Sequence, residues 1–162
     1  MQENKPAAIL RAMAEAGIEF IVVGGVAAVL NGAPLNTFDL DIVHARNATN
    51  VAKLLPLLDS LDAIFRFQPE RRIEPTAEYL SGPGHLNLIT RCGSLDLLGT
   101  IGRGLIYEDL LPRSADIEIA PGIRVRVLDL ETLIALKEEL GGEKDRAALP
   151  ILRATLAEKR KL

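Results

Sequence analysis

Two aspartates interrupt the otherwise apolar run Phe-Asp-Leu-Asp-Ile-Val at residues 38–43, and this pattern limits the structures that the chain can form. The alternation predicts a β-strand, in which successive side chains point to opposite faces. Asp39 and Asp41 then share one face, and the apolar residues around them point into the core. Two neighbouring carboxylates repel each other, and burial raises the pKa of at least one of them. The strand therefore needs an exposed face or a cation, and Mg²⁺, a hard ion that prefers oxygen ligands, is the natural candidate.

The same motif has a plainer alternative, because an isolated Asp-X-Asp most often marks an exposed strand with solvated acids. Its surroundings favour a site. A β-branched strand at residues 19–23 runs into Gly24 and Gly25, after which a helical pattern resumes at residues 26–31. Glycine lets the backbone approach a ligand closely and a helix N-terminus attracts anions, so this turn suits phosphate. Taken alone, it is also an ordinary way to join a strand to a helix.

A third acid, Asp96, lies in the apolar run at residues 94–99, which predicts another strand. An acid in such a run is costly unless it is exposed, paired or bound to a metal, so a solvated face or an arginine partner would also explain it. If its strand neighbours Asp39 and Asp41, the three carboxylates form a cage for one or two metal ions. Such a cage clamps the attacking and leaving oxygens of a phosphoryl transfer. Asp96 would then be the candidate base for an acceptor hydroxyl.

Helical and strand patterns are mixed along the rest of the chain. Predicted helices cover residues 7–16, 47–61, 107–111, 129–140 and 143–161, with Pro56 interrupting the second, Asp129 capping the fourth and Pro150 bending the last. Predicted strands at 85–90 and 94–99, and at 116–119 and 123–127, form two hairpins, while 63–67 is a further strand and 69–84 shows no pattern. This order predicts an α+β (mixed α/β) fold, a mixed β-sheet flanked by helices. We expect a single domain over residues 1–162, with 129–162 as a C-terminal helical part.

Composition argues against several other classes of protein. The 162 residues carry a formal net charge of −3, so the chain as a whole does not attract nucleic acid. Aromatic residues make up 4%, which argues against a base-stacking surface for single strands. The longest apolar run, residues 20–30, is too short to span a bilayer, and the N-terminus lacks a signal-peptide pattern. One cysteine, Cys92, allows no internal disulfide, and we expect a cytoplasmic protein with no membrane contact.

The glycine turn and the acidic motif together resemble a known superfamily. Val-Val-Gly-Gly-Val-Ala-Ala at residues 22–28 is followed by Asn-Thr-Phe-Asp-Leu-Asp-Ile at 36–42, with thirteen residues between Gly25 and Asp39. This is similar to the nucleotidyltransferases that share the polymerase-β fold, which show a strand, Gly-Gly or Gly-Ser, a helix, Asp-X-Asp on the next strand and a third acid further on. Residues 37–41 and, more loosely, 133–137 and 143–146 resemble the minimal nucleotidyltransferases and AbiEii-like toxins.

The resemblance implies a nucleotidyltransferase-like sheet and a nucleotide site. Gly24 and Gly25 would hold the triphosphate of a nucleoside triphosphate. Thr37, which opens the matched Thr-X-Asp-Leu-Asp element, and Lys137 would contribute to the same nucleotide site. For Lys137, a surface lysine whose stem borders the core is an equal alternative.

The resemblance also implies a reaction. Asp39, Asp41 and Asp96 would ligate Mg²⁺ (or Mn²⁺), and Asp96 would activate the acceptor. The implied enzyme transfers a nucleoside monophosphate to an RNA end, a protein or a small molecule and releases pyrophosphate.

Two departures from the pattern leave other functions open. Relatives often carry basic residues where this chain has Leu35 and Phe38, so two charges that would neutralise phosphate are missing. One alternative is therefore a catalytically degenerate binding module with this fold, such as a toxin–antitoxin component with an antitoxin partner. Another is an unrelated α/β domain with coincidental acids. The basic residues that could replace the missing pair are Arg46, Arg91, Arg103 and Lys137.

Overall fold

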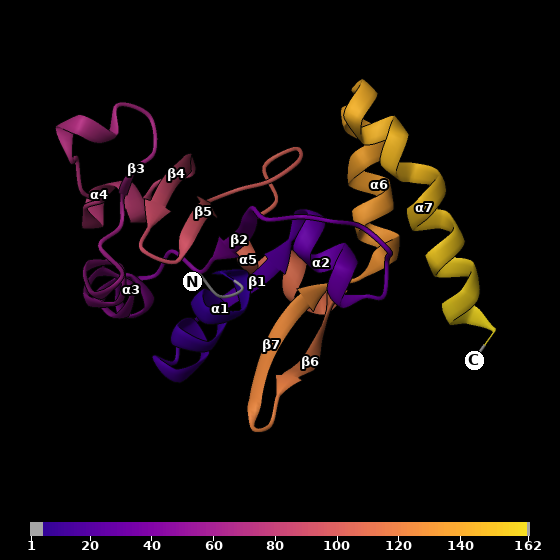
Figure 1. Ribbon diagram of the computed structural model, residues 1–162, viewed down its shortest axis with the longest axis horizontal. Coiled ribbons are helices and arrows are strands. Elements are labelled where there is room, and N and C mark those ends of the chain that lie inside the picture. Colours follow the sequence, from indigo (N-terminus) through magenta and orange to yellow (C-terminus); the bar gives the residue numbers. More distant parts are fainter. Residues whose placement is uncertain (1–4, 162) are drawn as a thin grey trace.

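A seven-stranded mixed sheet runs through the computed structural model, which describes residues 5–161 (Figure 1). The order of strands across it is β3-β4-β5-β2-β1-β7-β6. β2 pairs with β5, and β1 with β7, in parallel, whereas the other neighbours are antiparallel. The predicted α+β class is confirmed, and β2 with its acidic residue lies in the middle of the sheet. The strands are β1 (Phe20–Val23), β2 (Leu40–His44), β3 (Ile64–Phe65), β4 (His85–Thr90), β5 (Gly93–Leu98), β6 (Ser114–Ala120) and β7 (Ile123–Leu128).

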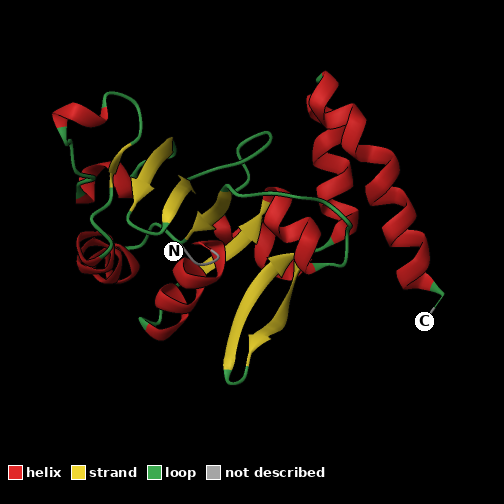
Figure 2. Cartoon of the chain, viewed as in Figure 1, coloured by secondary structure: helices red, strands yellow, loops and turns green. Residues whose placement is uncertain are grey.

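Seven α-helices flank this sheet within the described residues. Figure 2 shows α6 and α7 side by side at one end of the molecule and α3 and α4 at the other. α6 also contacts α2, so the C-terminal helices pack against the helix that follows the glycine turn. Between residues 5 and 161, no helix is long and apolar enough to cross a membrane. The helices are α1 (Lys5–Glu15), α2 (Gly24–Leu30), α3 (Ala48–Ser60), α4 (Ala77–Ser81), α5 (Tyr107–Leu110), α6 (Leu130–Leu140) and α7 (Glu143–Arg160), with short 3₁₀ turns η1 (Pro69–Arg71) and η2 (Leu111–Arg113).

The strand that carries the acidic motif is shorter than its sequence pattern predicts. β2 begins at Leu40, so Asp39 precedes the strand and does not lie within it. The reason is pairing: the ladder to β1 reaches only to Asp41, and the ladder to β5 begins at Leu40. Phe38, with no neighbouring strand to pack on, is 81% exposed. The predicted strand at 38–43 was therefore wrong at its first two residues.

Two further expectations from the sequence need correction. α3 runs without a break through Pro56, which was expected to interrupt it. Pro56 is exposed, so water can reach the backbone carbonyl that its missing N–H leaves without a helical partner. The unassigned segment 69–84 contains η1 and α4, and Thr76 caps α4 by accepting a hydrogen bond from the Tyr79 N–H at 3.4 Å.

Where the sheet is formed by β4 and β5, one of its faces is covered and the other is more open. Along both strands, buried leucines alternate with residues that stay partly exposed. Asn87 and Asp96 belong to the more open face. The buried set is Leu86, Leu88, Leu95 and Leu97, none more than 3% exposed.

His44 shows which helix covers the buried face. Its side chain lies on the same face of β2 as Leu40 and Ile42, and its Nε2 donates a hydrogen bond to the Leu80 carbonyl of α4 at 2.8 Å. Burial lowers the pKa of His44, so the ring is neutral at physiological pH. α4 therefore packs on the leucine side, and the carboxylates point to the opposite side.

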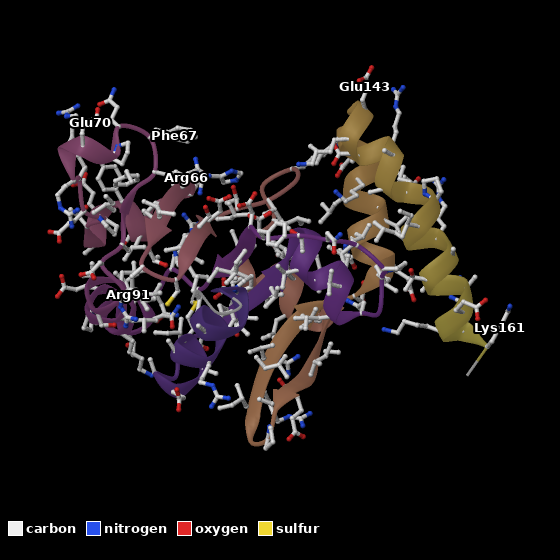
Figure 3. The ribbon with its side chains drawn as sticks, viewed as in Figure 1. Arg66, Phe67, Glu70, Arg91, Glu143 and Lys161 are labelled. Carbon is white, nitrogen blue, oxygen red and sulfur yellow. The ribbon has the colours of Figure 1, made fainter. Side chains whose placement is uncertain are left out.

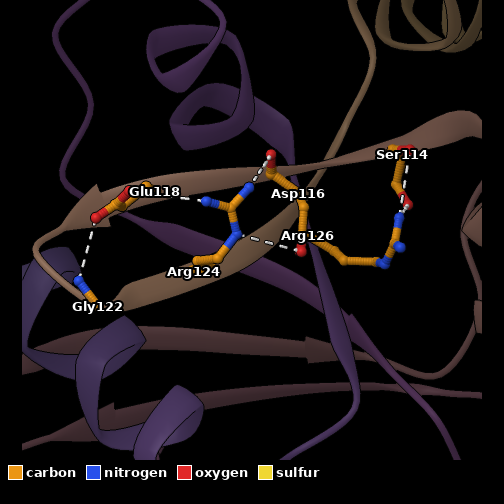
Figure 4. Close-up of polar contacts among 6 residues, drawn as sticks. All are labelled: Ser114, Asp116, Glu118, Gly122, Arg124 and Arg126. Atoms are coloured by element: carbon orange, nitrogen blue, oxygen red, sulfur yellow. Dashed lines mark hydrogen bonds and ion pairs between the residues drawn. The ribbon is translucent and has the colours of Figure 1, made fainter.

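The hairpin of β6 and β7 extends away from the rest of the sheet (Figure 1). Its basic residues are paired locally (Figure 4). Arg124 lies 3.4 Å from Asp116 and 3.7 Å from Glu118, and Arg126 donates to the Ser114 hydroxyl at 3.2 Å. Exposed pairs of this kind contribute little to stability, but they leave the hairpin without excess positive charge.

Candidate active site

The register of three strands aligns polar residues in a row across the open face. β2 and β5 pair so that Asp41 lies directly opposite Asp96. β4 and β5 pair so that Asn87 lies opposite Asp96 on its other side. On the β1 side, Asp41 lies opposite Val23, the residue before Gly24. The row therefore runs from the glycine turn through two facing carboxylates to an amide.

The two carboxylates are close enough to share a hydrogen bond, and this changes the acidity of Asp41. Its pKa is raised to about 7 from the ordinary value of 3.8. Burial is the largest cause, followed by the hydrogen bond and the charge of Asp96 and then by the charge of Asp39, whereas Arg66 acts in the opposite direction. Near neutral pH, a proton therefore reduces the repulsion between the carboxylates. A divalent cation could take the place of that proton.

Arg66 is the basic residue that contacts this acidic pair. Its Nη1 lies 2.9 Å from Asp96 Oδ1 and 3.1 Å from the Leu88 carbonyl oxygen. It directly follows β3, and its backbone N–H donates to the Asn87 carbonyl at 2.8 Å, which fixes it beside β4. The sequence analysis missed Arg66. The only signal was an arginine between two phenylalanines in a short strand pattern, which does not reveal the neighbour of that strand.

The glycine turn is pressed against the acidic motif. Gly24 has a φ of +66°, and a Cβ added to it would lie 2.6 Å from Asp41 Oδ2. A Cβ on Gly25 would lie 2.9 Å from the Thr37 hydroxyl. A side chain at position 24 would therefore be strained and would collide with Asp41. With Asp96 opposite Asp41, the structure thus brings together five residues that the sequence proposed for one site.

Asp39 lies at the edge of this group. It is exposed, but its charge contributes to the raised pKa of Asp41, so it is near enough to act on the pair. Within residues 5–161, no three acidic, histidine or cysteine side chains are already arranged as a metal site. The carboxylates do have the chemistry that a hard cation requires. To complete a three-carboxylate site, Asp39 must turn inward and Arg66 must release Asp96.

The other basic residues considered from the sequence make different contacts. Lys137 Nζ lies 3.2 Å from Asp145 Oδ1 of α7, in a pair whose side chains are each about one quarter exposed. In this structure Lys137 is therefore engaged in an ion pair, and its contact with a nucleotide stays a prediction. Arg103 pairs with Glu139, while Arg46 and Arg91 donate to backbone carbonyls at Ser81 and Ser60.

The two positions that lack the expected basic residues face an apolar groove. Leu35 and Phe38 line a groove of about 680 Å³ between α1, α2 and the β6–β7 hairpin, together with Val26, Val29 and Ile123. A charged side chain at the half-buried position 35 would lose part of its hydration there, whereas one at position 38, where Phe38 is 81% exposed, would stay in water. The groove is therefore consistent with an apolar residue at position 35.

Comparison with known proteins identifies the fold. No protein-family model and no curated protein matches the sequence. Among solved structures, the chain is similar to "a putative nucleotidyltransferase" from Thermotoga maritima, with 19% identity, a TM-score of 0.58, and coverage of 98% of this chain and 96% of that one. At this identity the likeness establishes the fold. The protein has a nucleotidyltransferase-like fold.

Replacing Gly24 with alanine should destabilise the chain through both backbone strain and contact with Asp41. We expect Gly24→Ala to lower the free energy of unfolding by about 1–3 kcal/mol, measured by urea denaturation. Gly84→Ala is the matched control, because its added Cβ meets nothing within 4 Å. It should change stability by less than about 0.5 kcal/mol. Equal effects of the two substitutions would contradict the close packing of Gly24 on Asp41.

The raised pKa of Asp41 should make stability depend on pH. Because this pKa is about 7 in the folded chain and 3.8 ordinarily, the folded state binds more protons between these values. Stability therefore falls as the pH rises from about 4 to 7. Asp41→Asn removes this cost, so with chelator present it should be more stable than the parent at pH 8 by about 1–3 kcal/mol, a range reduced for solvent screening.

At pH 4 the same substitution should have little effect, because Asp41 is then largely protonated in the folded chain. Thermal denaturation at several pH values measures the difference. Asp116→Asn, which removes an exposed carboxylate from the hairpin, is the control and should shift stability at pH 8 by less than about 0.5 kcal/mol. A difference between Asp41→Asn and the parent that does not vary from pH 4 to pH 8 would show that folding does not raise the pKa of Asp41.

Proposed function

We propose that this protein is a metal-dependent nucleotidyltransferase that transfers a nucleoside monophosphate from a nucleoside triphosphate to an acceptor. The observation that carries the proposal is the alignment of Asp41 with Asp96 across β2 and β5, directly beside the Gly24 turn. A pair of facing carboxylates is destabilising without compensation. The nucleotidyltransferase-like fold supports the same conclusion.

Asp39, Asp41 and Asp96 would hold the cation in this proposal. Their oxygen ligands suit Mg²⁺, and Mn²⁺ accepts the same ligand type. When bound, the metal neutralises charge on the triphosphate and on the oxygens of the transferred phosphoryl group. The register that sets Asp41 directly opposite Asp96 supports a shared role for these two carboxylates.

The chain's own residues would then bind the substrates and move one proton. The backbone of Gly24 and Gly25, with Thr37 beside it, binds the triphosphate. Asp96 accepts the proton of the acceptor hydroxyl. The acceptor oxygen forms a bond to the α-phosphorus, the bond from this phosphorus to the bridging oxygen breaks, and pyrophosphate leaves. Lys137 could join the nucleotide site only by leaving Asp145.

Nucleotide binding tests the proposal. Calorimetry with each of the four nucleoside triphosphates should detect binding that requires Mg²⁺ or Mn²⁺. The double variant Asp39→Ala, Asp41→Ala should weaken it more than tenfold, because it removes two of the three proposed carboxylate ligands. Asp116→Ala, which removes an exposed carboxylate on β6, should leave binding unchanged. If none of the four nucleotides binds with either metal, the proposal fails.

A second candidate function is a binding module that retains the fold without the reaction, as in a toxin–antitoxin component. Two observations favour it: Arg66 neutralises the proposed base Asp96, and the apolar Leu35 and Phe38 stand where phosphate-binding charges are expected. Incubation with each labelled nucleotide, Mg²⁺ and total RNA or lysate separates the two. Labelled product supports the enzyme and identifies the acceptor as RNA, protein or small molecule. Absence of label with all four nucleotides, together with an adjacent gene for a small antitoxin partner, supports the module.

A further inference from the structure

The order of residues across the sheet separates a donor end from an acceptor end of the site. Gly24 lies on the β1 side of Asp41, whereas Asn87 and Arg66 lie beyond Asp96 on the β4 and β3 side. If the triphosphate binds at Gly24 and Asp96 is the base, the acceptor hydroxyl approaches Asp96 from the β4 side. This step rests on the proposed function. The residues next to the acceptor are then Arg66, Asn87 and their neighbours.

Arg66 has unused hydrogen-bond donors in this position. Its Nη1 makes both of its side-chain hydrogen bonds to described residues, to Asp96 and to the Leu88 carbonyl. A guanidinium has five N–H donors in a planar fork that matches phosphate geometry. The side chain is 30% exposed, so a ligand can reach it. Arg66 can therefore offer its remaining donors to an oxyanion that approaches from solvent.

Phe67 places an aromatic ring next to this guanidinium. The Arg66 Cζ lies 5.5 Å from the centre of the Phe67 ring, and Phe67 is 68% exposed. Figure 3 shows Phe67 on the outer loop with Glu70, whereas Arg66 lies closer to the sheet. An apolar ring so exposed is free to stack on a planar ligand. One ring suffices for one base, in agreement with the low aromatic content of the whole chain.

Asn87 completes the group on the sheet itself. It lies opposite Asp96 on the open face and is partly exposed. Among the described residues, none forms a hydrogen bond with its side-chain amide. An amide offers both a donor and an acceptor, which suits a hydroxyl placed near the base.

We propose that Arg66, Asn87 and Phe67 form an acceptor subsite for a nucleotide-type molecule, either free or at the end of a strand. Arg66 exchanges its ion pair with Asp96 for a phosphate of the acceptor, and Phe67 stacks on the adjacent base. The exchange leaves Asp96 free to accept the proton of the acceptor hydroxyl. The subsite thus selects acceptors that carry a phosphate next to the reacting hydroxyl.

Binding of defined probes tests this subsite. Fluorescence anisotropy measures a labelled hexameric oligoadenylate, and competition compares adenosine monophosphate with adenosine, which differs only by the phosphate. Arg66→Gln should weaken oligoadenylate binding at least tenfold and abolish the advantage of adenosine monophosphate over adenosine, with Arg66→Lys intermediate. Phe67→Ala should weaken both probes about fivefold or more. Because one or two phosphates are bound, binding should fall only modestly with salt, with a logarithmic slope between about −0.7 and −1.4.

Arg153→Gln is the matched control, because it removes an arginine of α7 from an exposed ion pair with Glu138 of α6. It should bind every probe as the parent does. Thermal denaturation shows whether each variant still folds. Partial recovery of probe binding in Arg66→Lys then shows that Arg66→Gln binds weakly because it lacks contacts with the ligand.

Calorimetry with Mg²⁺ and nucleoside triphosphate measures binding at the donor end of the site separately. Arg66→Gln should retain donor binding, because Arg66 lies beyond Asp96 from Gly24. If the protein binds no triphosphate but its oligoadenylate binding still depends on Arg66, the phosphate subsite is supported and the proposed reaction is not. Equal oligoadenylate binding by Arg66→Gln and the parent overturns the subsite. Transfer of a nucleoside monophosphate to a protein side chain by Arg66→Gln, at the level of the parent, also overturns the subsite.

Discussion

The parallel register between β2 and β5 is the constraint on which the site depends. It places Asp41 opposite Asp96, and a shift of one residue would turn one of these carboxylates toward the covered leucine face. The covered face sets this register, because Leu40, Ile42, Leu95 and Leu97 are all buried there. Burial of apolar side chains therefore brings two like charges together. The hydrophobic core supplies the stability that allows this local repulsion.

Without a cation, the chain compensates the acidic pair in two ways. The raised pKa lets Asp41 hold a proton near neutrality, and Arg66 pairs with Asp96. Both are reversible, because a proton dissociates and an arginine that is partly exposed can rotate away. The close approach of Gly24 leaves no comparable freedom on the other side of Asp41. The site is therefore fixed beside Gly24, at the proposed donor end, and adjustable beside Arg66, at the proposed acceptor end.

Local sequence patterns were sufficient for much of the fold. Both hairpins, the helix that begins after Asp129 and the glycine turn follow from residues close in sequence, and Asp129 caps α6 by accepting a hydrogen bond from the Thr132 N–H at 2.8 Å. Strand alternation predicts a shared face for Asp39 and Asp41, but β2 begins only after Asp39 and does not include it. The functional roles of these residues stay predictions.

The sequence could not supply what depends on the order of strands. β3 has two residues, too few for a periodic pattern, and its place beside β4 brings Arg66 to Asp96 across 30 positions. The pairing of Lys137 with Asp145 likewise depends on how α7 folds back on α6. The groove that Leu35 and Phe38 line is built from α1, α2 and the distant hairpin. Each of these required the tertiary structure.

The location of a bound Mn²⁺ ion tests the central claim, because Mn²⁺ takes the same oxygen ligands as Mg²⁺ and scatters X-rays anomalously. Crystals grown at pH 8 with Mn²⁺ and a nucleoside triphosphate should show anomalous density between Asp41 and Asp96. Asp39 should be turned toward it and Arg66 should be moved away from Asp96. Nucleotide in the crystal with Mn²⁺ bound elsewhere, or with Asp96 still paired to Arg66, would contradict the account.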